Sequence, residues 1–252
     1  VVSPGVDNKS QPLVWAKQFG IPIISEIECA WILCSGTVIA ITGTNGKTTT
    51  ATLIGKVLES AGKRVFTLGN IGTPFCAQVD EIRSQDFVSL EVSSFQLETI
   101  KSFKPKISAI LNFKPDHLDR YVNLSEYLSA KTRIFMNQDE SDYLVLNYDD
   151  TLVRGLAKEA SAKVVYFNGR MHSNPNFAAV IAVASVLGID ASLCRGVFRS
   201  FGGLPHRLER VLIFKDREFI NDSKATNLDA TAFALLNTKK PVILIAGGKD
   251  KG

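Results

Sequence analysis

Short runs of aliphatic and β-branched residues alternate with amphipathic stretches through most of this chain, and this alternation limits the possible fold more than any other feature. It is typical of βαβ units, in which helices cover both faces of a mostly parallel sheet. We therefore expect an α/β fold. The expected strands are Val38–Ile41, Val65–Leu68, Phe87–Leu90, Ile107–Leu111, Tyr143–Leu146 and Val164–Phe167. The expected helices are Thr48–Ala61, which Gly62 would end, Leu124–Asn137 and Phe177–Leu187.

The pattern changes at both ends of the chain. We expect residues 1–35 to be the remnant of an N-terminal domain, 36–203 to be a central domain, and 204–252 to be the truncated start of a C-terminal domain. The elements expected in the two outer parts are a helix at Leu13–Phe19, strands at Ile21–Ile24, Arg210–Phe214, Glu218–Asn221 and Val242–Ile245, and a helix at Leu228–Leu236.

The composition excludes several classes of protein. With 252 residues, 45% of them hydrophobic, and a formal charge of +4, the chain is neither a disordered polyanion nor a nucleic-acid-binding tail. No apolar run approaches the roughly 20 residues that span a bilayer, so we expect no membrane insertion. The four cysteines lack C-x-x-C spacing, which indicates reduced thiols in a cytosol-like compartment.

A glycine-rich loop follows the first central strand and opens a helix. The loop consists of Gly43, Thr44, Asn45, Gly46, Lys47, Thr48 and Thr49. In this setting backbone N–H groups and the start of the helix can surround a phosphate, Lys47 can reach the β and γ oxygens, and Thr48 can bind Mg²⁺. The strict G-x-x-x-x-G-K-[ST] pattern would need glycine where Ile41 stands. We interpret the loop as a nucleotide-binding site rather than a structural turn.

Glu91 ends another buried strand and begins the run Glu91–Glu98. A carboxylate at the carboxyl edge of a parallel sheet, beside a phosphate loop, is well placed to bind Mg²⁺. The alternative is that Ser93 and Ser94 form a helix N-cap and that Glu91 is simply solvated. The residues alone leave both interpretations open.

Three later segments also carry polar residues. Asp116, His117 and Asp119 follow the strand Ile107–Leu111 and could orient a metal, although a lone histidine is more often a hydrogen-bonded loop residue. By itself, Lys131 on the next helix is interpreted as a solvated lysine.

The other two segments are Leu204–Glu209 and Asn221–Asn227. Arg207 in the first could bind a γ-phosphate, and Asp222 in the second could bind a ribose hydroxyl. Alternatively, the two segments are a charged hinge and an N-capped helix.

In this order, the segments resemble those of the Mur ligase family of ATP-dependent amide-bond ligases, and in particular the member that adds D-glutamate. The resemblance rests on Ser3–Gly5, Gly43–Thr48, Gly69–Gly72, Glu91–Glu98, Asp116–Tyr121, Leu204–Glu209 and Asn221–Asn227. It implies a UDP-binding domain, a central ATPase domain and a Rossmann-like C-terminal domain. It also implies that ATP phosphorylates the alanyl carboxylate of UDP-MurNAc-L-alanine, and that the amine of D-glutamate attacks the acyl phosphate.

The resemblance implies two Mg²⁺ ions in the central domain. Lys47 and Thr48 would hold phosphate, and Thr48 and Glu91 would hold the first ion. His117 and Lys131 would serve the second. The family's counterpart of Lys131 is carbamylated, which replaces a cation with a carboxylate-like group and reverses the interpretation of a solvated lysine.

Further positions carry over from the family as substrate and nucleotide contacts. Asn70, Ser93 and Gln96 match positions around the muramoyl substrate and the nucleotide phosphates. Asn176 is the retained residue of the adenine-side pattern His-Asn-x-x-Asn, in which Ser173 replaces the first asparagine. The connection 168–171 is shorter than in the family, which usually has a strand-rich stretch there.

The C-terminal part supplies the remaining matches. Arg207 and Asp222 match contacts to the γ-phosphate and the ribose. Lys224, expected to be catalytic, Thr226 and Lys251 match positions that face the phosphate or the incoming D-glutamate.

Other interpretations compete with this one. A P-loop kinase or simple ATPase shares the loop but does not explain Lys131 or Asn221–Asn227. A truncated nucleotide-binding relic without ligase activity and another Mur-type ligase are the remaining alternatives. The expected enzyme is a monomer in a bacterial cytoplasm or a plastid stroma.

Overall fold

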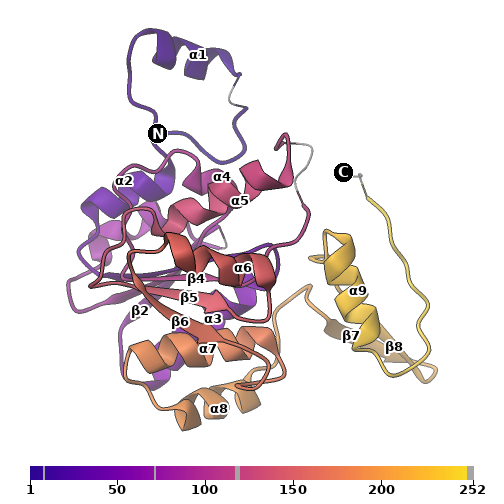
Figure 1. Ribbon diagram of the computed structural model, residues 1–252. Coiled ribbons are helices and arrows are strands. Elements are labelled where there is room, and N and C mark those ends of the chain that lie inside the picture. The colour runs from indigo at the N-terminus through magenta and orange to yellow at the C-terminus, as the bar shows by residue number, and fades with distance from the viewer. Residues whose placement is uncertain (8, 71, 117–119, 249–252) are drawn as a thin grey trace.

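A six-stranded sheet forms the centre of the computed structural model, which describes residues 1–7, 9–70, 72–116 and 120–248 (Figure 1). The strand order is β2-β3-β1-β4-β5-β6, and each neighbouring pair is parallel. The strands are β1 (Thr37–Thr42), β2 (Val65–Gly69), β3 (Phe87–Glu91), β4 (Ile107–Ile110), β5 (Tyr143–Asn147) and β6 (Lys163–Phe167). The α/β fold and the strands predicted for the central part are confirmed.

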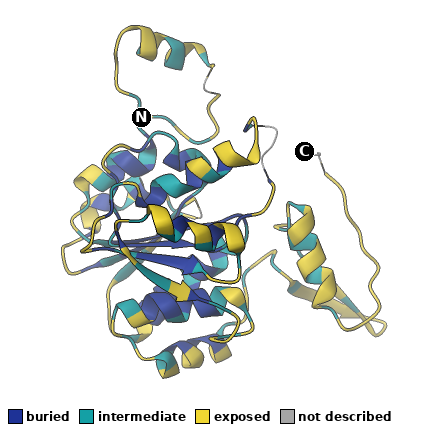
Figure 2. Cartoon of the chain, in the orientation of Figure 1, coloured by how far each residue is buried: buried dark blue, intermediate teal, exposed yellow. Residues whose placement is uncertain are grey.

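Helices cover both faces of the sheet, so its inner strands are buried on both sides, whereas the edge strands β2 and β6 are partly exposed (Figure 2). In β1, Val38 and Ala40 join one apolar core, whereas Ile39 and Ile41 join the other. Successive strand side chains point to opposite faces, which explains why these strands are apolar throughout. The helices on the first face are α2 (Glu26–Leu33), α4 (Ser94–Leu97), α5 (Leu124–Thr132) and α6 (Thr151–Gly155). Those on the second are α3 (Lys47–Ser60), α7 (Pro175–Val186) and α8 (Ala191–Ser200).

Most predicted helices are present, with one correction. The helix before Gly62 is confirmed, and Gly62 has the left-handed φ of 73° that a helix-ending glycine adopts. The stretch predicted as Leu124–Asn137 is divided, because α5 gives way to the 3₁₀ turn η3 (Arg133–Phe135), where Met136 N donates to the carbonyl of Arg133. The other 3₁₀ turns are η1 (Phe75–Ala77), η2 (Val79–Glu81) and η4 (Leu156–Glu159).

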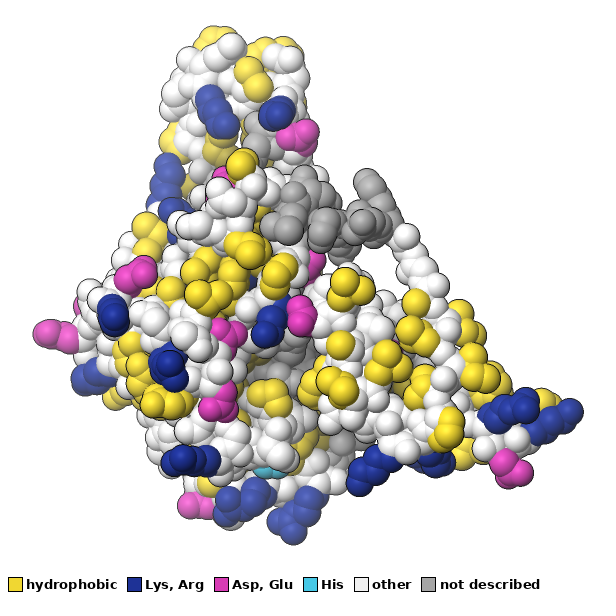
Figure 3. Space-filling view, turned by 45° about the vertical axis from the view of Figure 1, so that its right-hand side comes forward, with side chains coloured by type: hydrophobic (Ala, Val, Ile, Leu, Met, Phe, Trp, Pro, Cys, Tyr) yellow, Lys and Arg dark blue, Asp and Glu magenta, His cyan; other side chains and the backbone are white. Residues whose placement is uncertain are grey.

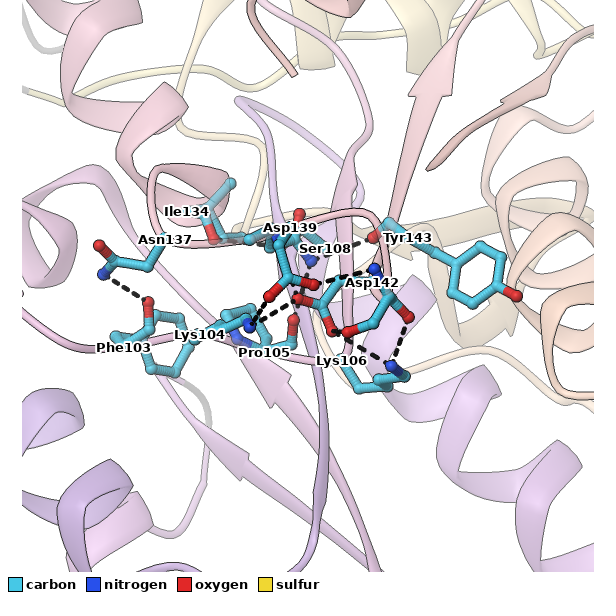
Figure 4. A network of polar contacts seen from close by, with 12 residues as sticks. Phe103, Lys104, Pro105, Lys106, Ser108, Ile134, Asn137, Asp139, Asp142 and Tyr143 are labelled. Atoms are coloured by element: carbon cyan, nitrogen blue, oxygen red, sulfur yellow. Dashed lines mark hydrogen bonds and ion pairs between the residues drawn. The ribbon is translucent and has the colours of Figure 1, made fainter. Parts of the chain in front are cut away.

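A polar network lies at the amino edge of the sheet, where β4 and β5 begin (Figure 4). Lys104 pairs with Asp139 and Asp142, and Lys106 pairs with Asp142 at 3.2 Å. We call these four residues the amino-edge network. In each pair the lysine contacts a carboxylate, so the network joins the starts of two strands without leaving an unpaired charge.

The two ends of the chain add α1 (Gln11–Gln18), β7 (Glu209–Phe214), β8 (Arg217–Asn221) and α9 (Leu228–Leu236). The helix predicted near Leu13–Phe19 and the predicted strands Arg210–Phe214 and Glu218–Asn221 are confirmed, and the structure pairs these strands antiparallel. The predicted strand Ile21–Ile24 is wrong, because the described part of the chain offers it no strand partner and has only an isolated bridge nearby, between Val2 and Ser25. The predicted strand Val242–Ile245 is also wrong, since no described strand lies beside it and Ile245 is 92% exposed.

Residues 204–248 differ from the sheet in burial. Hydrophobic side chains spread over the surface of this segment, including both β7 and α9 (Figure 3). Ile213 is 62% exposed and Leu236 is 86% exposed. The segment therefore stands beside the core instead of contributing to it.

Two further predictions concern the whole chain. Within the ranges the structure describes, no helix combines the length and apolarity that crossing a membrane requires. All four cysteines are free thiols, as predicted.

Candidate functional site

The glycine-rich loop lies at the carboxyl edge of the sheet, directly after β1. Because β3 and β4 flank β1 and run parallel to it, their ends reach the same edge: Ile41 is in register with Glu91, and Thr42 with Ile110. Binding sites in open parallel sheets are found at this edge. The sheet topology therefore brings together the loop, Glu91 and the segment after β4, as the sequence predicted.

Two glycines give the loop its shape. Gly46 has a φ of 84°, and a Cβ there would overlap the side-chain amide of Asn176 at the start of α7. Gly43 has a φ of 149°, and a Cβ there would lie 3.0 Å from the Cβ of Leu111. Asn176, expected on the adenine side, therefore packs directly against the loop.

Lys47 folds back over the loop. Its Nζ donates to the carbonyl oxygens of Gly43 at 2.9 Å and Thr44 at 2.8 Å. Burial lowers the pKa of Lys47, while the negative charges of Glu91 and Asp116 partly oppose that shift. The ammonium group is thus held at the mouth of the loop by carbonyl oxygens.

Lys131 reaches the same carbonyl from the other side. Its Nζ donates to Gly43 O at 3.0 Å and lies 4.5 Å from the centroid of the Tyr127 ring. The residue is 1% exposed, so the interpretation of a solvated helix lysine is wrong. Burial, and then the positive charge of Lys47, place the pKa of Lys131 well below its ordinary value.

Thr48 and Glu91 form a buried polar pair beside the loop, and the exposed Asn70 contacts it. The Thr48 hydroxyl donates to Oε2 of Glu91 at 2.7 Å, and the Asn70 amide donates to Oε1 at 3.1 Å. Glu91 is 3% exposed, so the alternative of a solvated carboxylate is wrong.

The oxygen atoms of Thr48 and Glu91 are the kind of ligand that Mg²⁺ prefers. Among the described residues, no three His, Cys, Asp or Glu side chains gather as a metal site. A bound Mg²⁺ would therefore take its other ligands from phosphate and water, as is usual for this ion in nucleotide sites.

Ser93 and Gln96 begin α4. The Ser93 hydroxyl accepts from the N–H of Gln96 at 3.3 Å, and the Gln96 carboxamide accepts from the N–H of Ser93 at 3.0 Å. This reciprocal pair is a capping box, which confirms the N-cap interpretation of the segment. A contact of either residue with a substrate stays a prediction.

The C-terminal segment touches the loop through two of its side chains. Arg207 donates to the Thr48 hydroxyl at 2.8 Å. The carboxamide of Asn227, which caps α9, lies 3.1 Å from both Oδ1 of Asn45 and Oδ2 of Asp116. These contacts bring Arg207 to the predicted metal and phosphate site.

The other candidates of this segment do not reach the loop. Asp222 accepts from the N–H of Leu208 at 3.1 Å, and Lys224 and Thr226 are exposed. Two further candidates, His117 and Lys251, lie outside the described residues.

The sequence interpretation missed Asn112 and Tyr127. Asn112 binds the loop backbone through both ends of its carboxamide. The hydroxyl of Tyr127 lies 3.5 Å from that of Thr44. The position of Asn112 directly after a predicted strand, at the edge that carries the loop, was the available signal for this residue. Tyr127 had no local signal, because a tyrosine on an amphipathic helix is ordinarily a core residue.

Comparisons with known proteins agree with this geometry. Residues 41–186 match the family model of the Mur ligase middle domain. The chain is 40% identical to the UDP-N-acetylmuramoylalanine--D-glutamate ligase of Caldanaerobacter subterraneus subsp. tengcongensis, over 100% of this chain and 63% of the relative. It is 41% identical to the ligase of the same name from Caldicellulosiruptor bescii, with the same coverage. The chain thus spans less than two thirds of the length of these relatives.

Solved structures of low sequence identity share the fold. MurF from Acinetobacter baumannii superimposes with a TM-score of 0.69 at 19% identity, over 85% of this chain and 57% of that one. MurF from Thermotoga maritima, in complex with ADP, gives a TM-score of 0.65 at 19% identity, over 83% and 59% of the two chains.

Proposed function

This chain belongs to the Mur ligase family, and from that premise we propose that it is the nucleotide-binding part of an ATP-dependent ligase joining D-glutamate to UDP-N-acetylmuramoyl-L-alanine. In this reaction the γ-phosphoryl group of ATP passes to the alanyl carboxylate and ADP leaves. The amine of D-glutamate then attacks the acyl phosphate, and inorganic phosphate leaves as the amide bond forms. The identity of about 40% with ligases of that name supports this choice of substrates.

The observation that carries the proposal is Lys47 beside the buried Thr48–Glu91 pair. Lys47 brings a positive charge to the phosphate loop, and the first N–H groups of α3 have no carbonyl four residues earlier within the helix to bind. Together they favour a triphosphate at the start of α3.

Thr48 and Glu91 would hold one Mg²⁺ and Lys131 would serve a second, with His117. Magnesium would supply the positive charge that offsets repulsion between a carboxylate and the triphosphate. Arg207, already in contact with Thr48, would add its charge at the γ-phosphate when a nucleotide is bound.

Lys131 would carry a carbamate. Two ammonium groups that share the carbonyl of Gly43 repel each other, and burial together with this repulsion lowers the pKa of Lys131, which favours its neutral amine. A neutral amine attacks CO₂ and releases a proton, which gives a carbamate with one negative charge. That charge would then face Lys47 and a metal ion.

The remaining assignments follow the family. Asn70, Ser93 and Gln96 would face the muramoyl substrate, and Asn176 the nucleotide. Asp222 would bind the ribose, and Lys224, Thr226 and Lys251 would face the phosphate or D-glutamate. We retain the three-part organisation 1–35, 36–203 and 204–252, and we place the enzyme as a monomer in a reducing, ATP-containing compartment such as a bacterial cytoplasm.

Binding of Mg-ATP to this chain, measured by titration calorimetry, tests the proposal. Lys47→Ala should weaken binding by about 10- to 100-fold, since a charge-assisted contact to phosphate contributes about 1.5–3 kcal/mol. Lys56→Ala is the matched control, because Lys56 lies exposed on the same helix. Equal affinities for the two variants would refute the assignment of the loop.

A further inference from the structure

Asn112 lies where the segment after β4 runs closest to the phosphate loop. β4 is the direct neighbour of β1, and the segments that follow these two strands stay side by side beyond the sheet. A Cβ at Gly43 would be 3.3 Å from the backbone nitrogen of Asn112, and the carbonyl of Asn112 accepts from the N–H of Thr44 at 3.1 Å. The segment and the loop are therefore in van der Waals contact, at a distance where a side-chain amide can bind backbone groups.

The carboxamide of Asn112 uses both of its ends on the loop. Its Oδ1 accepts from the N–H groups of Thr44 at 3.1 Å and Asn45 at 2.8 Å. Its Nδ2 donates to the carbonyl of Asn45 at 2.9 Å. A side chain must offer an acceptor and a donor a fixed distance apart to do this, which a carboxylate, a hydroxyl or an alkyl group cannot.

A second set of bonds holds the loop from the same segment. The Thr44 hydroxyl accepts from the N–H of Lys114 at 3.0 Å and donates to its carbonyl at 3.2 Å. The donors of Thr44 and Asn45 are thus committed to protein acceptors. The N–H groups at the start of α3, from Lys47 onward, remain for an anion.

The same bonds fix the carbonyl of Gly43. The peptide group between Gly43 and Thr44 contains both this carbonyl and the N–H that donates to Asn112. The carbonyl accepts hydrogen bonds from Lys47 and Lys131. A change in the orientation of that peptide would move the acceptor that places both lysines.

We propose that Asn112 is a positioning residue, which shapes the phosphate loop and the lysine pair before nucleotide binds and does not itself contact the nucleotide. The inference rests on the proposed function, since it assumes that the loop binds a triphosphate. A loop that is already in its binding shape loses less conformational entropy when the phosphates arrive.

The test uses Asn112→Asp in the chain as it stands. This change keeps the shape of the side chain and its acceptor oxygen. It replaces the amide donor with a carboxylate oxygen that faces the carbonyl of Asn45, and it adds a negative charge near the phosphates. Asn147→Asp is the matched control, because Asn147 is also half-buried and donates to the neighbouring carbonyl of Leu111 at 2.9 Å. If Asn112→Asp does not fold, Asn112→Ser replaces it.

Two measurements are needed for each variant. We expect Asn112→Asp to weaken Mg-ATP binding by about 10-fold or more, from charge repulsion and loss of the loop shape. Affinity for AMP, which lacks the β and γ phosphates, should change far less, and Asn147→Asp should bind both as the parent does. In Asn112→Ser, whose shorter side chain no longer offers this acceptor, hydrogen exchange without nucleotide should be faster at the amides of Thr44 and Asn45 than in the parent chain.

The outcomes are distinguishable. A parent chain that binds no Mg-ATP refutes the proposed function, and with it a role for Asn112 in nucleotide binding. If the parent chain binds Mg-ATP and Asn112→Asp binds it equally well, the positioning role is refuted while the proposed function survives. Equal losses for ATP and AMP would indicate a general structural defect and would also overturn the inference.

Discussion

Lysines occur at both edges of the central sheet, and their surroundings are opposite. In the amino-edge network Lys104 and Lys106 each contact an aspartate, and both lysines are partly exposed. At the carboxyl edge Lys47 is half-buried and Lys131 is buried, and both donate to one shared carbonyl, that of Gly43. Among the described residues, neither of these two lysines has a carboxylate within ion-pair distance.

The pKa shifts follow the surroundings. The hydrogen bond between Lys104 and Asp139 raises the pKa of the lysine and lowers the pKa of the aspartate. Both groups therefore stay charged over a wider pH range. At the carboxyl edge burial lowers the pKa of Lys131 and weakens its charge. The amino-edge network joins two strands and favours the charged forms of its lysines and aspartates. The lysine pair at the carboxyl edge has surroundings that disfavour the charged form, which is typical of a functional site.

The largest expected difference between the two edges is in reaction with CO₂. With ¹³C-labelled bicarbonate, NMR of the chain should show a carbamate signal that Lys131→Ala abolishes. Lys104→Ala should retain it, because Lys104 stays protonated and a protonated amine does not attack CO₂. A signal that persists in Lys131→Ala, or that is absent from the parent chain, would contradict the assignment.

The next difference concerns stability. In CO₂-free buffer at pH 7, Lys131→Met should raise the free energy of unfolding by about 1–3 kcal/mol. The reason is that an apolar side chain replaces a buried amine whose desolvation costs free energy. Gly43 O would still accept from Lys47. Urea unfolding of the two proteins measures the change.

Its pH dependence sharpens this prediction. The pKa of Lys131 is lowered in the folded state, so between that pKa and the unfolded value near 10.4 the unfolded chain binds more protons. The parent chain should therefore gain stability relative to Lys131→Met as pH rises through this window. A constant difference from neutral to alkaline pH would show that Lys131 does not titrate abnormally.

The central sheet could be predicted from the sequence because its inner strands β1, β3, β4 and β5 are mostly buried and largely apolar. Helices α2 and α8 were missed, although Ser25 and Asp190 cap them. Helix α2 has no clear amphipathic repeat, whereas α8 is strongly amphipathic, so its repeat was a signal that the sequence offered. The apolar run Val242–Ile245 was predicted as a strand on composition alone. A strand also needs a hydrogen-bonding neighbour, which this run lacks among the described residues.

The site was predictable where its chemistry is local. The loop and Glu91 are contiguous with strand ends, so their meeting follows from the parallel topology. The burial of Lys131 depends on how α5 packs over Gly43, 88 residues away in sequence, and no helical pattern around Lys131 shows it. The resemblance to the Mur ligases singled out this lysine where residue-by-residue reasoning could not.

The smallest expected effect is at the amino edge, in the variant that mirrors Lys131→Met. Lys106→Met removes an ion pair with Asp142 and a hydrogen bond to the carbonyl of Ser141, but Asp142 keeps Lys104 as a partner. Partly exposed pairs contribute about 0–1 kcal/mol, so unfolding free energy should fall by no more than that. Added salt should shrink the loss further, because the pair is screened by solvent ions. Urea unfolding at low and high salt measures both effects. A gain in stability, or a loss as large as the gain expected for Lys131→Met, would show that the two edges do not differ in how they hold their lysines.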